Sequence, residues 1–132
     1  MIHHKLTIFG DWQVDVFIND GGKPSIGLIT DCLYGMGADD AVVDRAVGMM
    51  EDDIPNEAFT YSANHCSCIY IGRTTSGEEF INSIVHEAYH LVHHIAKAYG
   101  IENDEKPAYI MGDVAFLLAE DICKLGCTHC RN

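Results

Sequence analysis

The sequence predicts an α+β fold with a small mixed or antiparallel sheet, on three observations. Short apolar runs typical of strands concentrate in the first 75 residues, apolar residues with a helical period span 77–99, and a second helical stretch follows. The chain has 132 residues, 48% of them hydrophobic, so it can bury one core without needing a second domain. We expect one domain over 1–132: strands and one helix in 1–75, two helices in 76–125, and a cysteine-rich tail in 126–132.

The first half of the chain is expected to form structural elements that carry no catalytic residues. Two strands are expected over 6–9 and 12–18, and a loop rich in Gly, Asn and Asp follows over 19–24. The segment 26–33 is ambiguous between helix and strand. The segment 39–51 predicts an amphipathic helix whose methionines fill the core.

Two further β-type runs, 59–62 and 68–72, precede a long helix that we expect over 77–99. Ser76, followed three residues later by Glu79, forms a capping box at its start, and Gly100 is typical of a C-terminal cap. Apolar residues then recur with helical period, at Ile81, Ile84, Val85, Ala88, Leu91, Val92, Ile95, Ala98 and Tyr99.

The middle of this helix carries the segment His86-Glu87-Ala88-Tyr89-His90. Two histidines four residues apart lie on one helix face, where both imidazoles can reach one zinc ion. The glutamate beside the first histidine can then take a proton from a metal-bound water. The segment therefore predicts two zinc ligands and a general base.

A catalytic zinc usually has a third protein ligand. His93 and His94 lie on the same helix, but His94 is about 12 Å along the axis from His86, too far to share one ion with the pair. The downstream helix that begins near Asp104 is the better source. Glu105 heads its apolar stripe, where a carboxylate needs a partner, and a metal ion is one such partner. A favourable interaction with the helix dipole is the alternative role for Glu105.

The motif helix together with the segment 104–112 resembles the gluzincin-type zinc metallopeptidases in compact form, and is closest to short zincin-like proteins of phage and prophage genomes. The resemblance covers about residues 60 to 123. It implies a zincin-like fold with zinc as cofactor, His86, His90 and Glu105 as ligands, and Glu87 as the base.

The spacing departs from larger gluzincins, because only fourteen residues separate His90 from Glu105. A tight antiparallel hairpin would place Asp113 level with His90, so Asp113 remains an alternative ligand. Zinc would polarise a substrate amide and lower the pKa of its water, and Glu87 would move the proton to the leaving amine. Tyr109, Tyr89 and His93 are candidates to stabilise the oxyanion.

In zincin-like folds the edge strand above the metal pairs with an extended substrate through backbone hydrogen bonds. Either 68–72 or 59–62 is a candidate for that strand. The implied partner is therefore a peptide or protein substrate. The oligomeric state is not predicted.

A net charge of −12, with eight basic residues that form no patch, argues against a nucleic-acid partner. No apolar run is long enough for a membrane span and the N-terminus does not read as a signal peptide, so we expect a cytosolic protein and no membrane partner. Six cysteines in such a chain favour thiols or metal ligands over disulfides. Cys123, Cys127, His129 and Cys130 offer half of a structural zinc site, which Cys66 and Cys68 would have to complete.

Three hypotheses follow. The chain is a zinc-dependent peptidase, or a zincin-like zinc-binding protein that has lost turnover and serves structure or protein binding, or an interaction protein whose histidine face is incidental. Zinc content separates the third hypothesis from the others, and replacement of Glu87 by Gln separates the first two.

Overall fold

The computed structural model describes residues 1–127. Its centre is a four-stranded mixed sheet of β1 (Ile2–Ile8), β2 (Trp12–Ile18), β3 (Ala58–Ala63) and β4 (Cys66–Ile71), in the order β1-β2-β4-β3. The pairs β1/β2 and β3/β4 are antiparallel, whereas β2 and β4 are parallel. The predicted α+β class with a mixed sheet is confirmed.

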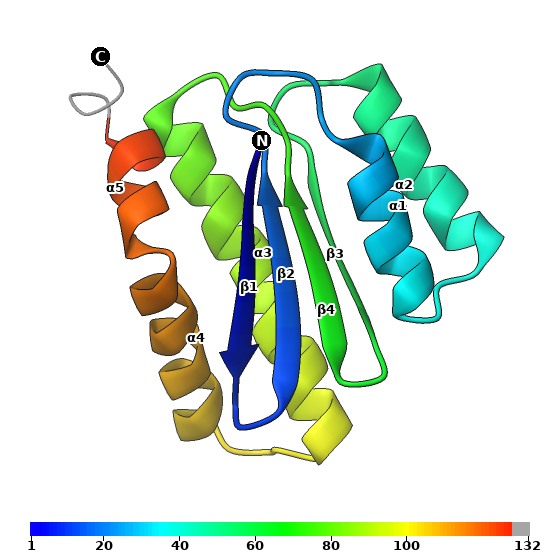
Figure 1. The fold of residues 1–132 in the computed structure, drawn as a ribbon. Helices are drawn as coiled ribbons and strands as arrows, with labels where there is room; N and C mark the ends of the chain where they lie inside the picture. The colour runs from blue at the N-terminus through cyan, green and yellow to red at the C-terminus, as the bar shows by residue number, and fades with distance from the viewer. Residues whose placement is uncertain (128–132) are drawn as a thin grey trace.

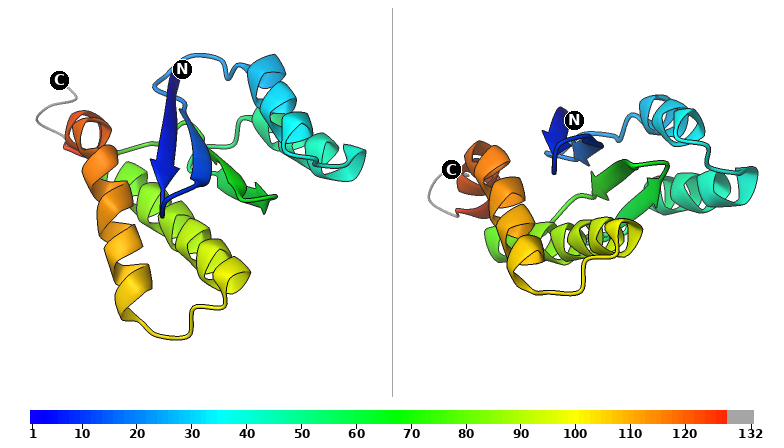
Figure 2. Two further views of the ribbon diagram at one scale, coloured as in Figure 1. Left: turned by 60° about the horizontal axis from the view of Figure 1, so that its bottom comes forward. Right: turned by 90° about the horizontal axis from the view of Figure 1, so that it is seen from below.

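Five helices cover this sheet: α1 (Ile26–Gly35), α2 (Asp40–Asp52), α3 (Gly77–Tyr99), α4 (Glu105–Leu117) and α5 (Ala119–Gly126). Figure 1 shows α1 and α2 on one side and α3, α4 and α5 on the other, and the view from below in Figure 2 separates the three layers. The connection from β2 to its parallel neighbour β4 contains α1, α2 and β3. A parallel pair needs such a long crossover.

Alternating side chains of the strands divide the interior into two cores, one on each face of the sheet. The β2 side chains Val14, Val16 and Ile18 pack with α3 to α5, whereas Phe17 packs with α1 and α2. The same alternation in β3 turns Phe59 and Tyr61 toward α1 and α2. The other face of β3 is therefore left to α3.

The long helix α3 has the predicted bounds. The Ser76 hydroxyl oxygen accepts a hydrogen bond from the Glu79 backbone N–H at 3.1 Å, which satisfies an N–H that the helix leaves unpaired. Gly100 ends the helix with φ at 65°, a left-handed conformation that glycine adopts at little cost. The helix therefore stops where the sequence placed its cap.

Two predictions about helices were wrong. The first 75 residues contain two helices instead of one, because the ambiguous segment 26–33 forms α1, which buries Ile29 and Leu33 one turn apart. The second helical stretch breaks at Leu118 into α4 and α5. Beyond the break α5 continues along α3 as far as its start, where Gly126 packs against Gly77 (Figure 1).

The buried face predicted for the helix after α3 was also wrong. Ile110 and Val114 are the buried residues of α4, whereas Phe116, which belongs to the apolar stripe that Glu105 was predicted to head, is 81% exposed. Glu105 is exposed as well. The premise that this carboxylate heads a buried face therefore does not hold.

None of the helices in residues 1–127 is both long enough and apolar enough to cross a bilayer. Cys32, Cys66 and Cys68 form no disulfide. The predicted half zinc site at the C-terminus includes His129 and Cys130, which lie outside the described residues.

Candidate metal centre and the adjoining hollows

Polar side chains of β3 face α3. Thr60 contacts Glu87 and Ser62 contacts His94, while Ala58 packs into the apolar core on the same side. β3 is the last strand of the sheet order, beyond β4, so the edge strand of the two candidates is 59–62. Its position beside α3 brings a strand edge next to the motif helix.

The two motif histidines converge. Nε2 of His86 and Nε2 of His90 lie 3.1 Å apart, at hydrogen-bond distance from one another, and the ring planes meet at 76°. Two nitrogens bound to one tetrahedral zinc at about 2.0–2.1 Å would lie about 3.3 Å apart. Both side chains are exposed. The pair therefore has the spacing and the access of two metal ligands.

Glu87 points to the other side of these histidines, toward the sheet. It is only 4% exposed, and its Oε1 accepts a hydrogen bond from the Thr60 hydroxyl at 3.0 Å. A buried carboxylate without such a donor would be costly. The same Thr60 hydroxyl lies 3.3 Å from the Glu87 carbonyl oxygen, so it ties β3 to the backbone of α3.

His86 and Glu87 share one cavity of about 370 Å³, which we call the histidine hollow. The other residues that line it come from α2, from the segment that enters β3 and from α3, namely Met49, Asn56, Glu57, Ala58, Asn82 and Ser83. The cavity therefore brings together a predicted ligand and the predicted base, and Glu57 contributes to its lining.

Within residues 1–127 the structure assembles no group of three His, Cys, Asp or Glu side chains that would hold a metal. Glu105 and Asp113 are therefore not brought to the histidine pair. α4 packs along the flank of α3 that carries Val85 and Ala88, and Asp113 lines a separate hollow with Thr7 and Phe9 at the end of β1.

The three predicted oxyanion donors also lie outside the histidine hollow. Tyr109 on α4 is 71% exposed, and Tyr89 is 59% exposed with its ring stacked on His93 at 5.6 Å. Asn82, whose side-chain amide carries two donors, lines the hollow instead.

Sequence reasoning did not assign roles to Thr60, Glu57 or Asn82. Asn82 had a local signal, because it precedes His86 by four residues and shares its helix face. Thr60 and Glu57 had none, since they reach the motif only through the packing of β3 on α3.

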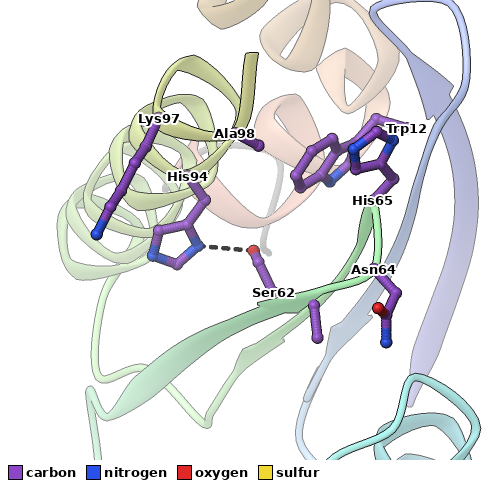
Figure 3. A pocket seen from close by; sticks show the side chains of 8 residues that line it. Trp12, Ser62, Asn64, His65, His94, Lys97 and Ala98 are labelled. Carbon is purple, nitrogen blue, oxygen red and sulfur yellow. Dashed lines mark hydrogen bonds between the residues drawn. The ribbon is translucent and has the colours of Figure 1, made fainter. Parts of the chain in front are cut away.

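A second cavity of about 450 Å³ lies farther along the same side of α3, and we call it the tryptophan hollow (Figure 3). Its lining residues come from β2, from the end of β3 with the turn that follows, and from the last turns of α3: Trp12, Ser62, Ala63, Asn64, His65, His94, Lys97 and Ala98. The ring of His94 stacks on that of His90 with 6.3 Å between centroids, so the two hollows flank the histidine pair.

A chain of short hydrogen bonds crosses the wall of the tryptophan hollow. The Trp12 indole N–H donates to the Ser67 oxygen at 2.8 Å, the Ser67 and Ser62 oxygens lie 2.7 Å apart, and the Ser62 oxygen lies 2.6 Å from Nδ1 of His94. The indole can only donate, so the Ser67 oxygen accepts from Trp12, whereas either serine hydroxyl can donate to the other. Ser67 is fully buried, and its hydroxyl lies against that of Ser62.

The direction of this chain and the tautomer of His94 are coupled. When Ser67 donates to Ser62, Ser62 donates to Nδ1 of His94 and the His94 proton lies on Nε2; when Nδ1 carries the proton, the two serine hydroxyls point the other way. Burial, together with the nearby His90, His93 and Lys97, lowers the pKa of His94 below its ordinary value. Both effects favour the uncharged form of this imidazole.

No family model, no curated protein and no solved structure matches this chain. A function can therefore be argued only from the residues and their geometry.

Proposed function

We propose that this protein is a zinc-dependent peptidase with a zincin-like arrangement, in which His86 and His90 hold the metal and Glu87 is the general base. The observation that carries the proposal is the 3.1 Å separation of the two Nε2 atoms beside a cavity that also contains Glu87. A zinc ion held there would polarise a peptide carbonyl and lower the pKa of a water.

The residues of this chain would do the rest. Glu87, fixed by Thr60, would accept a proton and return it to the leaving amine. Asn82 lines the same hollow and would donate to the oxygen on which charge develops. The edge strand β3 would pair with an extended peptide through its backbone.

Two carboxylates are candidates for the third ligand. The resemblance to gluzincins assigns Glu105, whereas Glu57 already lines the histidine hollow. Glu105 requires α4 to move from its place against Val85 and Ala88. We therefore expect Glu57→Gln to weaken zinc binding more than Glu105→Gln, measured by competition with a chromophoric chelator. Asp113→Asn, in its separate hollow, is the control.

Untagged protein tests the metal directly. After dialysis against zinc and then against metal-free buffer, elemental analysis should find one zinc per chain. His86→Ala and His90→Ala should each lower zinc affinity by more than the roughly 10- to 100-fold that loss of a ligand's hydrogen-bond partner costs. His93→Ala, an exposed histidine on the same helix, is the matched control. Absence of bound zinc, or an equal loss in His93→Ala, would overturn the proposal.

A catalytically inactive zinc-binding protein is the second candidate function. It is favoured by the position of Glu87, which is 4% exposed, points toward the sheet rather than to the histidine pair, and is held there by Thr60. Zinc-loaded protein should hydrolyse fluorescently labelled casein if the peptidase proposal is right. Glu87→Gln should retain zinc and lose that hydrolysis. Zinc-loaded wild-type protein without hydrolysis would assign the chain to the second candidate.

A further inference from the structure

The outer edge of β3 exposes backbone groups in a fixed alternation. Residues 64–65 form a two-residue turn with positive φ, so Ala63 and Cys66 close the hairpin as a hydrogen-bonded pair, and such pairs recur at every second residue. The Gly72 N–H donates to the Glu57 carbonyl oxygen at 2.9 Å, in phase with this alternation. β3 has no further strand beside it within residues 1–127. The backbone N–H and C=O groups that point to this free edge therefore belong to Ala58, Thr60 and Ser62.

A hollow of about 270 Å³ opens beside this edge on the side of α2, and we call it the α2 hollow. Since α2 and α3 lie on opposite faces of the sheet, the edge of β3 runs between them (Figure 2). The α2 hollow adjoins the histidine hollow, because Met49 lines both. Thr60 also lines it, although its side chain bonds Glu87 on the other face of β3, so the hollow reaches the edge of the strand. The remaining lining residues come from α2 and from the β3 side chains that face it: Val42, Arg45, Ala46, Phe59 and Tyr61.

The lining of the α2 hollow is mostly apolar and open to a ligand. Val42, Met49 and Phe59 are only half-buried, so their side chains stay accessible. Arg45 is exposed, and a long basic side chain can lay its methylene groups along apolar surface while its charge stays in water. The cavity is smaller than the roughly 300–1,000 Å³ typical of small-molecule sites. It therefore suits one large apolar side chain.

An extended peptide that pairs with the edge of β3 would place such a side chain in the α2 hollow. Successive side chains of a strand point to opposite faces, and directly opposite residues of paired strands share a face. A peptide residue opposite Phe59 or Tyr61 would therefore turn toward α2. Its immediate neighbours would turn toward α3, where His86 and Glu87 line the histidine hollow. The residue in the α2 hollow is thus adjacent in sequence to a residue at the candidate metal centre.

The charges around this edge disfavour an acidic peptide. Glu57 and Glu87 line the adjoining histidine hollow, and the whole chain carries a net charge of −12. Like charges brought together on binding suppress the wrong partner, so a neutral or basic peptide is the complementary one. Arg45 is the one basic residue that lines the α2 hollow, which makes a carboxylate side chain the competing occupant there.

We propose that the free edge of β3 binds an extended, non-acidic peptide by strand addition, and that the α2 hollow selects a large apolar side chain on that peptide. Val42 from α2 and Phe59 from β3 are then specificity-determining residues, because they line the hollow from its two sides. The proposal rests on the proposed function only for the place of the selected residue next to the cleaved bond. Strand pairing and the filling of the hollow need no metal.

Peptide titration of chelator-treated protein tests the selectivity of the hollow. The probes are acetylated, amidated pentapeptides with a central Leu, Ala or Glu between two threonines on each side, followed by nitrogen–proton correlation spectra. We expect the Leu peptide to bind saturably with a dissociation constant of about 1 mM or tighter, and at least about tenfold more tightly than the Ala peptide. Equal binding of these two peptides, or no saturable change with the Leu peptide, would contradict the proposal. So would tighter binding of the Glu peptide, which would assign the hollow to a carboxylate at Arg45.

Amide hydrogen exchange tests the strand pairing. In the free protein the edge amides of Ala58, Thr60 and Ser62 lack a partner strand, so we expect them to exchange fast. The Leu peptide at ten times its dissociation constant leaves about one molecule in eleven free, so exchange at these three amides should slow by about tenfold. The amide of Gly22, in an exposed loop, should be unaffected. Edge amides that exchange as fast with the peptide bound would show that it does not add to β3.

Substitutions locate the site. Val42→Phe fills the hollow from α2 and should abolish the preference for Leu over Ala, whereas Val47→Phe makes the same change on the same helix outside the hollow and should keep it. Loss of the preference in both variants would reject the site. Phe59→Ala enlarges the hollow from β3 and should shift the preference from Leu to a central Trp, and an unchanged preference would count against the site even if Val42→Phe does not fold. Since no metal is present, these results are separate from the test of zinc binding.

Discussion

Thr60 is the residue on which the geometry of Glu87 depends. Its hydroxyl donates to the buried carboxylate at 3.0 Å. Thr60→Val keeps the shape of the side chain and removes the donor, so a buried charge loses its partner. We expect the free energy of unfolding to fall by about 1–3 kcal/mol, measured by urea denaturation of metal-free protein.

Thr7→Val is the matched control for this prediction. The Thr7 hydroxyl donates to Gln13 on an exposed pair, so its loss should change stability by no more than about 0.5 kcal/mol. If Thr60→Val and Thr7→Val are equally stable, the carboxylate of Glu87 reaches water and the threonine is not needed to hold it.

For single residues, the sequence could predict only contacts between neighbours on one helix or in one turn. The convergence of His86 and His90 follows from a spacing of four on a helix, so it was predictable. The chain from Trp12 through Ser67 and Ser62 to His94 was not, because its members are separated by up to 82 positions and meet only when the sheet forms. The zinc role and the third ligand stay predictions.

Among the elements, α3 was predictable because three independent signals agree: a cap, an amphipathic period and a terminal glycine. α1 lacked them, since its Ser25 makes no capping hydrogen bond and only Ile29 and Leu33 are buried. The break at Leu118 contains no glycine or proline from which it could have been predicted. The flank of α3 on which α4 packs is decided by tertiary contacts, and the number of residues between the two helices does not predict it.

The contact between the ends of α3 and α5 is set by two glycines. A Cβ at Gly77 would clash with the carbonyl oxygen of Gly126, and one at Gly126 would lie 2.8 Å from Ile81. Gly77→Ala should therefore displace α5 and lower the free energy of unfolding by about 1–3 kcal/mol. Urea denaturation measures the loss, and faster amide exchange in α5 locates it.

Gly48 in α2 provides the opposite case. A Cβ there meets nothing within 4 Å, so Gly48→Ala should gain helix propensity and raise the free energy of unfolding by about 0.5–1 kcal/mol. The two variants make the same chemical change in two helices. A Gly77→Ala protein as stable as wild type would mean that α5 is not packed at the start of α3.

For the whole molecule, twenty acidic residues against eight basic ones leave an excess of negative charge. Basic residues do not offset this negative charge equally in all parts of the fold. α2 ends on Glu51 and Asp52 with no basic residue in its last turn, where the helix dipole already carries partial negative charge. Folding gathers charges that the unfolded chain keeps apart, so self-repulsion should lower stability at low salt.

Added salt should therefore stabilise this protein. Raising NaCl from about 0.01 M to about 1 M shortens the screening length from roughly 30 Å to roughly 3 Å, from about the size of the domain to less than the distance between most surface charges. Each 1 kcal/mol of relieved repulsion should raise the Tm of a chain this size by roughly 3–5 °C. Thermal unfolding of chelator-treated protein measures the rise. The variant Glu51→Lys/Asp52→Lys should be more stable than wild type at low salt and should gain less from NaCl, because part of the repulsion is already gone. A Tm that stays constant or falls with NaCl would mean that charge repulsion does not limit the stability of this fold.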